Sequence, residues 1–143
     1  MNLVTFFEND LDKLTSEISL FKDEASVWEI KEGITNSAGN LTLHLLGNLN
    51  HFIGKTLGNN GYVRNRDEEF SLKNIPREKI ISDISDLKET IKNTLSKLSA
   101  EELQKDFPIK IREEVYTTQN MLIYLLSHLN YHLGQVNYLR RMI

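Results

Sequence analysis

Four stretches of this chain carry apolar residues at alternating steps of three and four, the spacing that places them on one face of an α-helix. The first stretch, for example, repeats through Leu3, Phe7, Leu11 and Leu14. Each stretch has about 20 residues, so each helix would be about 30 Å long, the diameter of a small domain. The sequence therefore predicts an all-α fold with long helices over residues 2–22, 37–57, 76–98 and 118–141.

The segment between the second and third of these helices has no such periodicity. Residues 58–75 are rich in Gly, Asn, Arg and Asp, and we predict that they form a connection. About 18 extended residues can span roughly 60 Å, which is enough to return the chain to the other end of a helix. We therefore expect a four-helix bundle with a long crossover between helices 2 and 3, formed by residues 1–143 as a single domain. Residues 99–105 begin with a capping-box pattern and should add one short helical turn.

Composition excludes several classes of protein. The 143 residues are 40% hydrophobic, enough for one core, and contain no cysteine, which excludes disulfide frameworks, thiolate metal sites and cysteine nucleophiles. The formal net charge of −3 argues against nucleic-acid binding, which needs a basic face. Neither a basic leader followed by an apolar run nor a stretch of about 18 apolar residues is present. We expect a cytoplasmic protein without a membrane partner.

All four histidines fall in the second and fourth predicted helices. His128 and His132 are four residues apart and should project from one face, about one turn apart. An i, i+4 pair alone is a weak metal motif, but burying unpaired imidazoles costs about 1–3 kcal/mol each, so a ligand should compensate for them. With His44 from the second helix, the set becomes three neutral nitrogen donors. Such a set suits a divalent metal, zinc, nickel or ferrous iron, with one position left for water or substrate.

Other metal and catalytic motifs are missing. A carboxylate-bridged di-iron site needs Glu three residues before His, and those positions hold Leu41, Asn48, Leu125 and Leu129. The sequence also has no His-Glu-x-x-His motif and no nucleophile elbow. Catalytic residues other than the metal ligands are therefore not identified.

Three further polar residues are candidates for lining the site. Asn48 and His51 follow His44 along one face of helix two, and Gln135 lies one turn after His132. Asn48 and Gln135 either line the site or satisfy the bundle interior. His51 is about 10 Å from His44 along the helix, too far to share its ion, and is either a proton shuttle or a packed structural residue.

Four glycines lie inside predicted helices, where each costs about 1 kcal/mol relative to Ala. We interpret them mainly as points of close helix packing. They are Gly39, Gly47, Gly54 and Gly134.

Two segments of the sequence resemble a known family. The run Ser37-Ala38-Gly39-Asn40-Leu41-Thr42-Leu43-His44-Leu45 resembles the helix-two signature of the DinB family. The run from His128 through His132-Leu133-Gly134-Gln135 to Leu139-Arg140 is similar to its helix-four signature. The resemblance implies a DinB/YfiT-like bundle, usually a homodimer, with a divalent metal held by His44, His128 and His132. It also implies activities like those of thiol-dependent S-transferases, in which the metal activates a low-molecular-weight thiol.

Three functions therefore compete. We expect a metal-dependent enzyme acting on a small molecule, such as a thiol S-transferase or a related transferase or hydrolase. The alternative is a non-catalytic, metal-stabilised dimer with a stress-response or binding role, which a closed coordination sphere would favour. A third is a dimeric ligand-binding protein without metal.

Overall fold

The computed structural model describes residues 2–143. Helices joined by loops make up this part of the chain, which contains no β-strand, so the all-α prediction is confirmed. Three of the long helices begin at a polar cap: Asn2, Ser37 and Thr117 accept hydrogen bonds from backbone N–H groups of the first turn. In chain order the elements are α1 (Leu3–Leu20), η1 (Ala25–Trp28), α2 (Ala38–Leu49), η2 (Asn50–Leu57), α3 (Arg66–Ser71), α4 (Arg77–Leu95), α5 (Ala100–Gln104) and α6 (Thr118–Met142).

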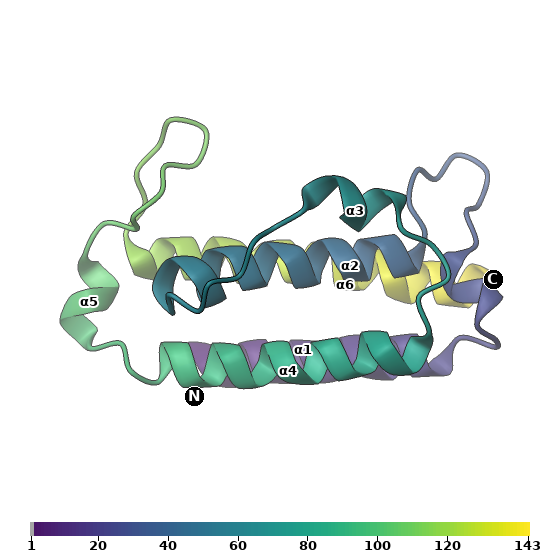
Figure 1. Ribbon diagram of the computed structural model, residues 1–143, viewed down its shortest axis with the longest axis horizontal. Coiled ribbons are helices and arrows are strands. Elements are labelled where there is room, and N and C mark those ends of the chain that lie inside the picture. Colours follow the sequence, from purple (N-terminus) through teal and green to yellow (C-terminus); the bar gives the residue numbers. More distant parts are fainter. Residues whose placement is uncertain (1) are drawn as a thin grey trace.

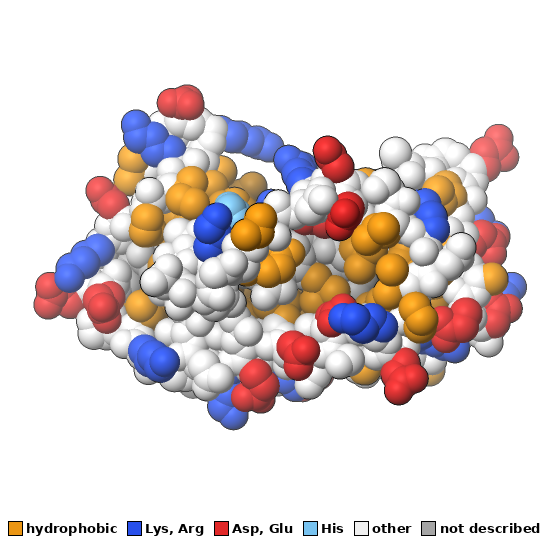
Figure 2. All heavy atoms as spheres, in the orientation of Figure 1, with side chains coloured by type: hydrophobic (Ala, Val, Ile, Leu, Met, Phe, Trp, Pro, Cys, Tyr) orange, Lys and Arg blue, Asp and Glu red, His pale blue; other side chains and the backbone are white. Residues whose placement is uncertain are grey.

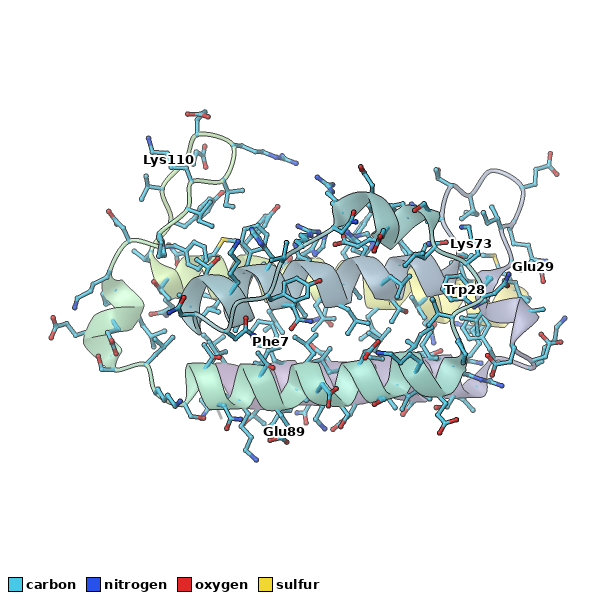
Figure 3. All side chains as sticks on the ribbon, viewed as in Figure 1. Phe7, Trp28, Glu29, Lys73, Glu89 and Lys110 are labelled. Atoms are coloured by element: carbon cyan, nitrogen blue, oxygen red, sulfur yellow. The ribbon has the colours of Figure 1, made fainter. Side chains whose placement is uncertain are left out.

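The long helices lie in two layers (Figure 1). α1 packs beside α4 in one layer, and α2 with its extension η2 packs beside α6 in the other. Apolar side chains fill the space between the layers: Figure 3 shows Phe7 there, while Glu89 points outward from α4. The largest fully buried side chains are Phe7, Leu11, Leu14, Ile18, Leu45, Leu49, Ile53, Ile80, Ile84, Leu87, Ile91 and Met121.

The second helix changes its hydrogen bonding near its end. Its predicted range is helical, but from Asn50 the backbone adopts π-helical geometry, with one bond running from Gly58 N to Ile53 O. A π-turn inserts an extra residue per turn and therefore rotates the residues that follow it. His51 lies in this π-helical segment.

The connection between η2 and α4 contains a helix that we did not predict. α3 lies in the middle of it, over α2 (Figure 1). The Asn65 side chain caps its first turn by accepting from Glu68 N, and the acidic residues of that turn interact favourably with the helix dipole. Residues 58–75 are therefore a connection that contains one short helix, which the missing apolar periodicity did not reveal.

Two smaller features complete the fold. The predicted turn at residues 99–105 is confirmed as α5, with a capping box between Ser99 and Glu102. Residues 106–117 form a hairpin that projects from the end of the helical layers, with Lys110 in its outer part (Figure 3). No helix in the described part of the chain is both long and apolar enough to cross a membrane.

Leu11 and Leu20 provide a matched test of this core. Both are leucines of α1, but Leu11 is fully buried and Leu20 is 62% exposed. We expect Leu11→Ala to lower the free energy of unfolding by about 2–5 kcal/mol, because it removes transfer energy and leaves a cavity. Leu20→Ala should change it by less than about 0.5 kcal/mol. Urea unfolding of the two variants measures the difference, and equal losses would contradict the described packing of α1.

Candidate metal centre

Three histidines that are distant in sequence meet between α2 and α6. His128 Nε2 lies 3.2 Å from His44 Nε2 and 3.2 Å from His132 Nε2. One nitrogen from each ring falls in a group whose members all lie within 4.8 Å of one another. Nitrogen ligands bound at 2.0–2.1 Å in a tetrahedral zinc site are about 3.3 Å apart, so two of these separations match such a site.

The outer nitrogens of two of the rings show where their protons lie. His44 Nδ1 faces Glu69 Oε1 at 3.0 Å, and His132 Nδ1 faces Gln135 Oε1 at 2.7 Å. Both partners are acceptors, so each Nδ1 carries a hydrogen and donates it. In the neutral rings, Nε2 of His44 and Nε2 of His132 then carry no hydrogen, and their lone pairs are directed at His128. A single N–H on His128 could satisfy only one of them, whereas a cation would satisfy all three.

Glu69, from α3, is the buried anchor of this arrangement. Its side chain is 5% exposed and receives two hydrogen bonds of 2.8 Å from Arg64, one from Nε and one from a terminal nitrogen. Burial alone would raise the pKa of Glu69, but the hydrogen bonds from Arg64 and His44 outweigh it, and the net pKa is lowered. The carboxylate is therefore charged at neutral pH and fixes the orientation of His44.

A glycine makes room for this carboxylate. A Cβ atom at position 47 would overlap the carboxylate of Glu69. Gly47 therefore allows α3 to approach α2 closely enough for Glu69 to reach His44, one turn earlier on α2. This agrees with the interpretation of the helical glycines as points of close packing.

His128 has the most unusual environment of the three. Its Nδ1 is buried and has no hydrogen-bond partner among residues 2–143. Desolvation, together with the nearby His132, His44 and arginines, lowers the pKa of His128 to about 4. Desolvation also lowers the pKa of His132, against the opposing effect of its bond to Gln135. The rings of His128 and His132 are therefore neutral at pH 7, the form that binds metal.

The structure places the three predicted lining residues differently. Gln135 borders a cavity of about 380 Å³, which His132 also lines. Asn48 is buried, with a side-chain oxygen that has no partner in the described chain. His51 is outside the three-histidine group and packs edge-on against Phe52, with its pKa lowered by burial and by the charges of Arg64 and Lys55.

Two of the three rings are partly accessible. His44 is buried, but His128 and His132 are only partly buried. On the face shown in Figure 2, a histidine side chain is visible in a hollow between the 106–117 hairpin and α3, with Lys and Arg side chains at its rim. His132 also lines a cavity, so a small molecule could reach this ring without unfolding of a helix.

Sequence reasoning missed Glu69 and Arg64. Nothing in their spacing relates them to His44, which lies 25 residues before Glu69. The local signal that was present is Asn65 followed by three acidic residues, a helix-start pattern that would have placed Glu69 on a short helix. That signal would not have shown which way the side chain points.

The lowered histidine pKa values predict how the metal-free protein responds to acid. Between about pH 6.5 and pH 4 the unfolded chain binds protons at residue 128 that the folded chain does not, so folding stability falls as pH is lowered through this window. Urea unfolding in the presence of a chelator at pH 7.5, 6 and 5 should show this loss. His128→Leu should make the dependence shallower, and an identical dependence in both proteins would show that residue 128 titrates normally.

The Glu69 contact predicts an effect on metal affinity. Glu69→Gln keeps the shape of the side chain but removes the charge that stabilises the His44 N–H, and we expect about 10–100-fold weaker zinc binding. Glu68→Gln makes the same chemical change on the neighbouring exposed residue and should leave affinity unchanged. Competition with a chromophoric chelator measures both variants, and equal affinities would mean that Glu69 plays no part in binding.

Comparison with known proteins gives a family but no activity. None of the curated proteins shows significant similarity to this chain. Residues 5–143, nearly all of the chain, match the model of a family described as a protein of unknown function, DUF1572. The chain therefore belongs to the DUF1572 family.

Proposed function

We propose that this chain is a DinB/YfiT-like, divalent-metal-dependent enzyme whose centre is formed by His44, His128 and His132. The observation that carries the proposal is the convergence of three imidazole nitrogens, two of which are oriented by Glu69 and Gln135. In this view the four long helices form a four-helix bundle, and residues 58–75 are its crossover. Zinc, nickel and ferrous iron are the ions that suit three neutral imidazoles.

The donor set favours an open site. The group contains three histidines and no fourth His, Cys, Asp or Glu among the described residues. Glu69 faces Nδ1 of His44, on the side of the ring away from Nε2. Three protein ligands with a remaining position for water or substrate are typical of catalytic zinc centres, whereas structural centres are closed by four.

The surrounding residues would then bind and orient a small substrate. A divalent ion at this position would lower the pKa of a bound thiol or water and so favour the nucleophilic anion. Glu69 and Gln135 hold two of the rings in the tautomer that presents Nε2. The cavity beside His132 offers neutral polar groups and apolar walls to the second reactant. We propose a thiol S-transferase or a related small-molecule transferase or hydrolase.

Metal content provides the first test. We expect the purified wild type, loaded with zinc and dialysed at pH 7.5, to retain about one ion per chain. His128→Ala should lose it, because it removes the nitrogen that contacts both other rings. His51→Ala is the matched control, since His51 lies outside the group, and should retain the ion. Elemental analysis that found metal in His128→Ala would contradict the assignment of the ligands.

Turnover provides the second test. Metal-loaded wild type and His128→Ala should be compared in a screen of low-molecular-weight thiols against electrophiles. The loss of free thiol over time measures the reaction. We expect activity in the wild type alone. A protein that binds one ion but reacts with none of the thiols would favour the non-catalytic, metal-stabilised alternative.

A further inference from the structure

The cavity beside His132 is bounded by a loop and by the end of a helix. Residues 29–37 connect η1 to α2 and lie at the C-terminal end of α6 (Figure 1). Gly33 has a φ of 79°, a conformation that strains other residues, and the turn closes with a 3.0 Å bond from Ile34 N to Lys31 O. Ile34, directly after the turn, lines the cavity together with residues of α6. The cavity volume of about 380 Å³ lies in the range of roughly 300–1,000 Å³ that small-molecule sites occupy.

No charged side chain of residues 2–143 lines this cavity, although charged residues are close to it in the sequence. The loop contains Glu29, Lys31 and Glu32, and the last turn of α6 contains Arg140 and Arg141, but none of the five belongs to the lining. Lys31 pairs with Glu29, and Arg140 pairs with a carboxylate of α1. A charged ligand would lose hydration in the cavity without meeting an opposite charge. The lining therefore favours an uncharged molecule.

Two tyrosines of α6 also line the cavity. Tyr131 and Tyr138 are 66% and 63% exposed and lie two helical turns apart on one side of α6. The Tyr131 ring meets the His132 ring nearly edge-on, with centroids 5.1 Å apart and planes at 73°. Aromatic rings attract one another by more than the area they bury. The two exposed rings therefore favour a flat aromatic ligand over an aliphatic one.

Neutral hydrogen-bonding groups complete the lining. Thr35 and Asn36 contribute a hydroxyl and an amide from the loop, and Gln135 contributes an amide from α6. The Oε1 atom of Gln135 is bonded to His132 Nδ1, and its NH₂ group is a donor that this bond does not use. Such groups can bind a carbonyl or amide of an uncharged ligand and fix its orientation.

We propose that this cavity binds an uncharged aromatic molecule with a carbonyl or amide substituent, and that such molecules are the substrate class of the metal centre. His132 connects the two statements, because its ring lines the cavity and its Nε2 lies 3.2 Å from that of His128. The substrate role rests on the proposed function, since it requires an ion at the three histidines. Binding of the molecule does not, because the rest of the lining lies outside the three-histidine group.

An aromatic anion is the nearest alternative ligand. A divalent ion at the three histidines would attract a negative charge, so affinities measured on the loaded protein would combine this attraction with the preference of the cavity itself. Measurements on the metal-free protein separate the two effects. The first test therefore uses the full chain with a chelator present.

An NMR titration of the metal-free protein compares three ligands of similar size. The first is 1-naphthamide; 1-naphthoate has the same rings and a negative charge, and decahydronaphthalene-1-carboxamide has no aromatic ring. We expect 1-naphthamide to bind about tenfold more tightly than either of the others. Equal or tighter binding of 1-naphthoate would overturn the uncharged class, and equal binding of the saturated amide would overturn the aromatic class. Absence of 1-naphthamide binding would overturn both.

Substitutions in α6 test whether the ligand occupies this cavity. Tyr131→Leu should weaken 1-naphthamide binding about fivefold, because it removes a ring from the lining, whereas Tyr131→Phe keeps the ring and should bind within about twofold of wild type. Tyr124→Leu is the matched control: Tyr124 is also a tyrosine of α6, 40% exposed, but it does not line the cavity. Unchanged binding by Tyr131→Leu, or equal losses in the two leucine variants, would overturn the assignment to this cavity. Circular dichroism confirms that each variant is folded.

Cobalt tests the position of the ligand relative to the metal centre. Co²⁺ is paramagnetic and relaxes nearby ligand protons, whereas Zn²⁺ does not. The protons of 1-naphthamide should relax faster with the cobalt-loaded protein than with the zinc-loaded protein, because His132 both lines the cavity and belongs to the three-histidine group. Equal relaxation of the bound ligand would overturn the substrate role. A protein that binds 1-naphthamide but retains neither ion would instead refute the proposed function, and with it the substrate role, while the ligand class of the cavity would stand.

Discussion

Mutual orientation of three imidazole rings is the constraint on which the centre of this structure depends. Each ring directs a nitrogen towards the same small volume between α2 and α6. Neutral rings cannot satisfy all three nitrogens with their own protons, since Glu69 and Gln135 accept the N–H groups of two of them. A cation among the rings would accept all three lone pairs, which is why we propose a metal centre here.

Several features of the fold serve this orientation. α3 brings Glu69 to His44, and Gly47 leaves the space that its carboxylate occupies. Arg64 keeps that carboxylate charged despite its burial. The chain therefore uses an ion pair to fix the orientation of His44, and removing Arg64 would leave the carboxylate of Glu69 buried without its charged partner.

The sequence was sufficient to predict the parts that depend on local periodicity. The long helices follow from the three-four spacing of apolar residues, and His128 and His132 follow from their separation of four on one helix. His44 was placed with them because it lies on the other mostly buried helix. The distances of 3.2 Å agree with that grouping.

The sequence was not sufficient where a tertiary contact decides the outcome. The partnership of Glu69 with His44 joins residues from different elements, and no regular spacing encodes it. The helix that begins as α2 becomes π-helical from Asn50, and the apolar periodicity does not reveal this change. The glycines of the helices looked alike in sequence, and only the structure separates Gly134, with its open surroundings, from the three that pack closely.

The most direct test of the metal centre is an anomalous-scattering map from crystals of the zinc-loaded protein, with data on both sides of the zinc absorption edge. We predict one strong peak about 2.0–2.1 Å from Nε2 of each of His44, His128 and His132, with a non-protein atom as the fourth ligand. A fully loaded protein whose zinc peak lies elsewhere, with the three Nε2 atoms free, would contradict the account.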